Sequence, residues 1–85
     1  MKNAKITIKK HEGAWTTGKI GGYDFEVKHF EKGSEWGIEE GRISKLWIRK
    51  TGEQQPIAAY DRGWDKLPTT DNELDITQAI IDEFN

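Results

Sequence analysis

The sequence has no cysteine, and it has only two histidines and two prolines among 85 residues. Without cysteine the chain can form no disulfide, no thiolate-bound zinc or iron–sulfur site and no cysteine nucleophile. Long apolar runs are also missing, because no window approaches the roughly 18 apolar residues of a membrane helix or the shorter apolar core of an export signal. We therefore expect a cytoplasmic protein without a membrane span.

Size and composition predict one domain with a thin core. Hydrophobic residues make up 34% of the chain and charged residues 33%, and an independently folding unit usually needs about 50 or more residues. We therefore take residues 1–85 as a single domain. Its net charge of −2 hides an asymmetry, because residues 1–50 hold 11 Lys and Arg against 7 Asp and Glu, and residues 51–85 hold 2 against 8. Folding can preserve or cancel this asymmetry.

Apolar residues recur at every second position in the first part of the chain, which is typical of strands with one buried face. The strands expected from this pattern cover residues 4–8, 14–20 and 23–29, with a turn at 10–13. Gly21-Gly22 predicts a tight hairpin between the second and third strands. The third strand has the clearest alternation, and one of its faces carries Tyr23, Phe25, Val27 and His29.

The next part of the chain is less regular. Residues 36–38 suggest a short extended piece between two turns. Over residues 43–49 apolar side chains fall on both faces, which predicts a central strand covered on both sides. Ile43 and Trp47 would lie on one face, and Leu46 and Ile48 on the other. Pro56 has no amide hydrogen to donate, so it suits the start of a strand over residues 56–60, which we expect to be the last one.

The apolar period changes after Pro68. Thr70 with Glu73, or Asp75 with Gln78, has the spacing of a capping box at the start of a helix. The residues Ile76, Ala79, Ile80 and Phe84 then form one apolar stripe. The predicted fold is α+β, an antiparallel β-meander of four to five strands with one C-terminal amphipathic helix packed on one face.

The segment Gly13 to Lys19 matches the first seven positions of a phosphate-binding loop. The match fails next, because Ile20 stands where that loop requires a magnesium-binding hydroxyl, and Gly21-Gly22 replaces the first turn of the required helix. We therefore interpret Gly18 and Lys19 as residues of a hairpin strand.

The sequence contains no recognisable catalytic or metal-binding motif. His11 and His29 are the two imidazoles, and nearby acids reproduce no metal-site spacing. We predict that His29 is a packed, hydrogen-bonded strand residue. Ser34 and Ser44 lack a nucleophile-elbow motif, although a catalytic triad can be recognised only by its geometry. We therefore predict no enzymatic activity, no cofactor and no metal site.

Four tryptophans are many for a chain of this length. Trp15 and Trp47 lie within predicted strands, and we interpret them as core residues whose large rings compensate for a small core. Trp36 and Trp64 lie in irregular segments flanked by glycine. There an exposed indole can anchor a protein partner or stack on an unpaired base.

The segment from Tyr60 to Asp65 places two carboxylates, a guanidinium and an indole around Gly63, as expected for a binding loop on a rigid scaffold. The alternative is a structural role in which these charges pair locally, for example Arg62 with a glutamate of the Glu39-Glu40 turn. The candidate partner-binding residues are Trp36, Arg42, Asp61, Arg62, Trp64 and Asp65.

A pattern of residues between Trp15 and Asp65 resembles that of a known group of proteins. The matching positions are Trp15, Gly18, Ile20, Gly22, Tyr23, Phe25, Gly33-Ser34, Gly37-Ile38, Gly41 to Leu46, and Tyr60 to Asp65. The group consists of small uncharacterised proteins encoded by phages, prophages and mobile elements of Gram-positive bacteria. The resemblance implies an origin but no catalytic or binding residue. Small proteins of such origin often bind a host protein, including components of host defence.

The leading functional prediction is a non-enzymatic binding protein whose partner is a host or phage protein. Loops 33–41 and 61–65 would make the contact, with Trp36 and Trp64 as anchors and Arg42 and Arg62 as polar clamps. The alternative is a single-stranded nucleic-acid-binding domain that uses aromatic residues and the N-terminal lysines, although those lysines also suit a solvated sheet edge. We expect a monomer or a weak homodimer paired through an exposed edge strand.

Overall fold

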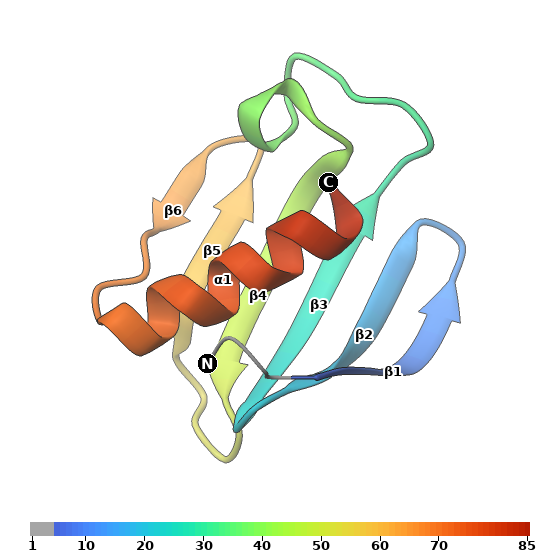
Figure 1. The fold of residues 1–85 in the computed structure, drawn as a ribbon. Coiled ribbons are helices and arrows are strands. Elements are labelled where there is room, and N and C mark those ends of the chain that lie inside the picture. The colour runs from blue at the N-terminus through green and yellow to red at the C-terminus, as the bar shows by residue number, and fades with distance from the viewer. Residues whose placement is uncertain (1–4) are drawn as a thin grey trace.

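The computed structural model describes residues 5–85, which form one antiparallel sheet and one α-helix. The six strands of the sheet are ordered as they follow in the chain, and α1 crosses one face of the sheet (Figure 1). The elements are β1 (Ile6–Glu12), β2 (Trp15–Ile20), β3 (Tyr23–His29), β4 (Ile43–Lys50), β5 (Pro56–Asp61), β6 (Trp64–Lys66) and α1 (Asp71–Phe84). The predicted α+β meander with a terminal helix is confirmed, with six strands instead of four to five.

The strands β2 and β3 form the hairpin predicted at Gly21-Gly22, and Gly21 adopts a φ of 58° in the turn. The predicted faces of β3 are also confirmed, because Tyr23, Phe25 and Val27 are buried while Glu26 is exposed. Gly18 lies within β2, as expected for a strand residue. A phosphate-binding loop is therefore absent at this position.

A bulge at the start of β4 changes which of its residues enter the core. Lys28 of β3 pairs with Lys45, whereas His29 pairs with Ile43, so Ser44 is an extra residue in β4. The extra residue lets Ile43 and Leu46 both be buried, and it turns Trp47 to the opposite face. The predicted grouping of Ile43 with Trp47 is therefore wrong. The strand is central, as predicted, but within residues 5–85 it is covered on one side only.

Three predicted boundaries also change. The strand β1 continues through residues 10–12, where we expected a turn. Residues 38–40 form a single 3-10 turn in place of an extended piece. The strand β5 is followed by the short strand β6, so Trp64 and Asp65 lie on a strand and not on a loop.

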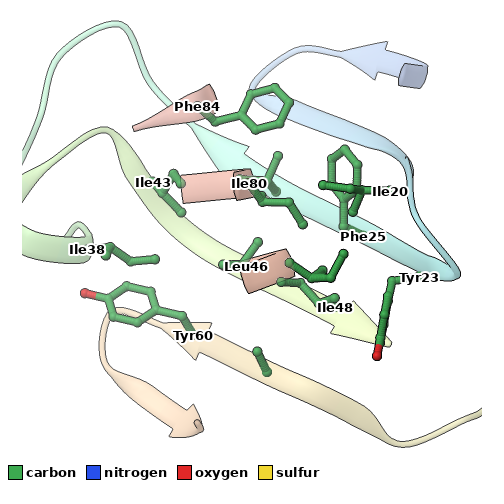
Figure 2. Packing of buried hydrophobic residues seen from close by; sticks show 13 residues of the cluster. Ile20, Tyr23, Phe25, Ile38, Ile43, Leu46, Ile48, Tyr60, Ile80 and Phe84 are labelled. Carbon is green, nitrogen blue, oxygen red and sulfur yellow. The ribbon is translucent and has the colours of Figure 1, made fainter. Parts of the chain in front are cut away.

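The helix begins where the capping pattern predicts. The Thr70 hydroxyl accepts a hydrogen bond from the Glu73 amide at 3.1 Å, and the Glu73 carboxylate accepts one from the Thr69 amide at 3.0 Å. The apolar stripe packs on the sheet, where Ile80 lies above β3 and β4 and the Phe84 ring lies 5.7 Å from the Phe25 ring (Figure 2). One face of the sheet therefore forms the core together with α1.

The end of the helix is tied to the start of β4 by Asn85. Its side chain accepts a hydrogen bond from the Ile43 amide and donates one to the Ile38 carbonyl, both at 3.0 Å. The Arg42 guanidinium donates to the Asn85 carbonyl at 3.3 Å. A side chain at Gly41 would collide with Asn85, so glycine is required for this close approach.

The helix covers only part of its face of the sheet. In Figure 1, α1 lies across β3, β4 and β5, and the edge strand β1 stands away from it. Ile8 is therefore 54% exposed, and the buried face predicted for the first strand is wrong at this residue. Ala4 of that prediction lies outside the described residues. No helix in residues 5–85 is long and apolar enough to span a membrane.

Candidate binding surface

The face of the sheet opposite α1 carries two indoles among charged side chains. The strand registers place on it Trp15, Thr17 and Lys19 of β2, Asp24, Glu26 and Lys28 of β3, Lys45, Trp47 and Arg49 of β4, and Ala59 and Asp61 of β5. No element within residues 5–85 packs over this face as α1 does over the other. We call it the open face.

Both strand tryptophans lie on the open face and not in the core. Trp15 is 37% exposed and Trp47 is 41% exposed. Our interpretation of these two residues as core residues is therefore wrong. The reason is topological, because a meander with a single helix can cover only one face of its sheet. An indole on the other face remains in contact with water.

A hollow of about 330 Å³ lies between the two indoles, at the lower end of the size range of ligand pockets. Its open-face lining comes from Trp15, Glu26, Lys45, Trp47, Ala59, Asp61 and Asp65. Glu26 lies directly opposite Trp47 in the sheet, and Ala59 lies on the other side of Trp47. Because alanine is small, the space beside the Trp47 ring stays open.

Glu26 is at the centre of the open face. It also lines two neighbouring hollows, one toward Arg49 and the other toward Glu12. Trp15 and Trp47 each line one of these two hollows as well. The three hollows therefore form one continuous, uneven surface that surrounds the Glu26 carboxylate.

Ion pairs neutralise some charges of the open face and leave others available. The Asp61 carboxylate lies 3.9 Å from both the Lys45 ammonium and the Arg62 guanidinium. The Asp24 carboxylate lies 3.3 Å from the Lys19 ammonium. Within residues 5–85, no ion pair engages Glu26 or Asp65. These two carboxylates can therefore form ion pairs with positively charged groups of a ligand.

At the rim of the open face, a lysine side chain lies over two aromatic rings. The Lys28 ammonium lies 6.0 Å from the centre of the Trp15 ring and 5.5 Å from the centre of the Phe30 ring. At such distances a cation is attracted by the quadrupole of the ring. The protein therefore already uses one indole of this surface for a cation–π contact.

The residues predicted to bind a partner do not form a single surface. Asp61 and Asp65 lie in the hollow between the indoles. Trp36 is 57% exposed and lines a separate hollow together with Arg62, and that hollow shares Lys45 with the first one. These four residues therefore belong to the open face or to its margin.

The other two predicted residues make contacts within the fold. Trp64 is 38% exposed, about as much as Trp15, but its ring lies on the helix side of the sheet and packs edge-on against Tyr60, 5.1 Å away. Arg42 binds Asn85 at the end of the helix. The hydroxyl of Tyr60 also donates to the Trp36 carbonyl at 3.0 Å and so supports the loop that carries Trp36.

The two histidines form a hydrogen-bonded cluster through a buried threonine. The Thr16 hydroxyl lies 2.7 Å from Nδ1 of His11 and 3.0 Å from Nε2 of His29. The His29 ring also packs 5.1 Å from Phe84, which confirms our prediction of a packed strand residue. Burial lowers the pKa of His29, and the charges of Arg42 and His11 lower it further. No group of three metal-ligating side chains occurs within the described part of the chain.

Sequence reasoning missed Trp15 and Trp47 as surface residues, and it did not select Glu26 as a candidate binding residue. The alternation carries part of the information, since Trp47 lies between Lys45 and Arg49 at a spacing of two, but it does not show that the bulge puts Ile43 on the other face. Trp15 likewise shares a face with Thr17 and Lys19. A tryptophan that alternates with the buried positions and shares a face with charges belongs to the surface.

Comparison with known proteins identifies a family but no characterised relative. No curated protein and no solved structure gives a significant match to this chain. Residues 14–85 match the model of a family described as Domain of unknown function (DUF7678). That match includes β2 to α1 and thus every residue of the hollow between the two indoles. The chain belongs to the DUF7678 family of uncharacterised proteins.

Proposed function

We propose that this protein is a non-enzymatic binding protein that docks a partner protein on its open face. Trp15 and Trp47 are the anchors, and Glu26, Asp61 and Asp65 supply the polar contacts. The observation that carries the proposal is the exposure of two indoles on either side of a hollow on a regular, hydrogen-bonded sheet. Tryptophan is enriched among the residues that contribute most to protein–protein affinity.

The proposal extends to the identity of the partner. A host or phage protein fits the resemblance to proteins of phages, prophages and mobile elements, and a cytoplasmic protein of that origin would meet such partners. The hollow with Trp36 and Arg62 adjoins the hollow between the indoles through Lys45 and would extend the contact area. We assign Trp64 and Arg42 to the support of the fold.

Capture from lysate with a matched set of variants tests this proposal. The lysate is taken from the organism that encodes the protein. We expect the wild type and Leu74→Ala to retain the same dominant partner, because Leu74 is exposed on α1, opposite the open face. Trp47→Ala should lose that partner while keeping its circular dichroism and its unfolding midpoint. Loss of the partner with Trp64→Ala and retention with Trp47→Ala would instead favour a surface around β6.

Single-stranded nucleic acid is a weaker candidate for the open face. Three carboxylates, those of Glu26, Asp61 and Asp65, line the hollow where bases would stack, and they would repel the phosphates that dominate nucleic-acid affinity. We therefore expect oligonucleotides to leave the tryptophan fluorescence unchanged at low salt. Quenching that weakens as salt is added would contradict the proposal.

A further inference from the structure

We propose that the hollow between Trp15 and Trp47 holds the guanidinium of an arginine side chain presented by the partner. This inference rests on the proposed function and specifies the chemistry that the open face recognises. It predicts a ligand motif, an extended segment with one arginine at a fixed position, that would distinguish partners from other proteins.

The first argument is the charge of the hollow. Its lining contains three carboxylates, from Glu26, Asp61 and Asp65, against the single ammonium of Lys45. Lys45 is already directed to Asp61, which Arg62 contacts at the same distance. The hollow is therefore acidic, and Glu26 and Asp65 have no ion-pair partner within residues 5–85. A cationic group would complete the pairing of these carboxylates.

The second argument is the aromatic lining. A cation that enters the hollow meets a lining that contains two indoles as well as carboxylates. The neighbouring Lys28 shows the same chemistry, since its ammonium lies over the Trp15 and Phe30 rings. Tryptophan is also the aromatic side chain that attracts cations most strongly.

The shape of the cation selects arginine over lysine. A guanidinium is planar, so it can stack on an indole while its edge donates two parallel hydrogen bonds to one carboxylate. An ammonium is a compact and strongly hydrated charge that cannot do both. Glu26 lies directly opposite Trp47 in the sheet, which places a carboxylate beside a ring as this arrangement requires.

A displayed library of random twelve-residue peptides provides the test, with the intact protein as bait. Selection on the wild type should enrich one arginine at a constant position relative to an apolar residue. We expect Glu26→Gln to weaken the best peptide by at least about tenfold, because the charge-assisted hydrogen bonds are lost. The matched control is Glu53→Gln, which removes the same charge from an exposed turn outside the open face.

Two substitutions in the selected peptide sharpen the result. Citrulline in place of arginine keeps the shape and removes the charge, and lysine keeps the charge and removes the planar fork. Both should bind at least about tenfold more weakly than arginine. In amide correlation spectra, the arginine peptide should shift the indole signals of Trp15 and Trp47 more than that of Trp64.

Failure of this inference is distinct from failure of the proposed function. Peptides that depend on Trp47 but lack a fixed arginine, or that bind equally well with citrulline or lysine, would overturn the arginine site and leave protein binding intact. Equal affinities of the wild type and Glu26→Gln would also overturn it. If no peptide is enriched and no partner is captured from lysate, both proposals fail.

Discussion

At Gly18 the sheet leaves no space for a side chain. A Cβ atom at this position would collide with the Thr7 carbonyl of β1 and would press on the Phe25 ring. Gly22 lies in the turn after β2, and a Cβ atom there would have no neighbour within 4 Å. The two glycines therefore have different roles, although they are only four residues apart.

We predict that Gly18→Ala destabilises the protein by about 1–3 kcal/mol, as overpacking of a well-packed site does. Gly22→Ala should change the free energy of unfolding by less than about 0.5 kcal/mol, the range of most surface substitutions. Urea unfolding of the two variants beside the wild type measures both values. Equal effects would show that the approach of β1 to β2 is looser than described.

The pKa of His29 links the folded state to pH. Burial is the largest cause of its lowered pKa, followed by the positive charges of Arg42 and His11. Since the unfolded state takes up this proton more readily, the contribution of His29 to stability is fully present above its ordinary pKa of 6.5. That contribution is lost as the pH falls below 6.5 and through the lower folded pKa.

We predict that a titration of the His29 ring signals by nuclear magnetic resonance gives a pKa below 6.5. His11→Gln should raise that pKa, because it removes one of the positive charges that lower it. The pH dependence of unfolding between about pH 5 and 7 should be weaker in His29→Gln than in the wild type. An unchanged slope in His29→Gln would contradict this assignment.

Residue-scale patterns predicted His29 and the buried face of β3 correctly and misplaced two tryptophans. In β3 the alternation is uninterrupted, so each face follows from the spacing. In β4 the bulge at Ser44 breaks the spacing, and a bulge depends on pairing with a neighbouring strand, which the residues of β4 alone do not reveal. Trp47 was therefore grouped with the wrong neighbours.

At the scale of elements, α1 is the structure that closes the core. Ile76 and Ile80 are fully buried beneath it, and Leu74 of the same helix is exposed to solvent. Short helices are marginal alone, so α1 depends on the apolar stripe that packs against the sheet.

We predict that Ile80→Ala lowers the free energy of unfolding by about 2–5 kcal/mol, the range for truncation of a buried isoleucine. Leu74→Ala is the matched control on the same helix and should cost less than about 0.5 kcal/mol. Thermal or urea unfolding measures both losses. Similar losses in the two variants would contradict the described docking of α1.

Element-scale predictions succeeded where residues close in sequence determine the structure. The hairpin at Gly21-Gly22 and the capping box at Thr70 each depend on residues close in sequence. The strand β6 has only three residues, and it forms because its backbone pairs with β5. A loop with Arg62 at a φ of 57° connects them, and such a positive φ is uncommon for a residue other than glycine.

At the scale of the molecule, coverage by the helix divides the sheet into regions of unequal stability. The strands β3 and β4 are central and carry six of the ten buried apolar residues of the sheet. The edge strand β1 has a bulge and an exposed Ile8, and β6 is short. Regions with few buried apolar contacts open locally before the whole protein unfolds.

Amide hydrogen exchange should reflect this division. We expect the amides of β3 and β4 to be the most protected and to exchange only with global unfolding. The amides of β1 and β6 should exchange faster by at least about tenfold. Uniform protection across the six strands would show that the edges are as stable as the centre.

Whole-molecule features were the most difficult to predict. The sequence predicts β1 to β5 and α1 in their observed order, but it predicts neither β6 nor how far α1 extends across the sheet. The open face follows from that extent, and so does the hollow between Trp15 and Trp47. Asp61 and Asp65 are the two carboxylates of this hollow that the sequence analysis selected as candidates, because they cluster in the sequence. Glu26 was missed because its neighbours in the hollow are distant in the chain.

The order of the elements also has a consequence during synthesis on the ribosome. All six strands leave the exit tunnel before α1 does. The apolar face of the nascent sheet, with Phe25, Leu46 and Ile48, is therefore exposed to solvent until the helix at residues 71–84 emerges and covers it. During that interval we expect holdase chaperones to bind the exposed apolar face of the ribosome-bound chain. A stalled chain that ends before Asp71 should be prone to aggregate.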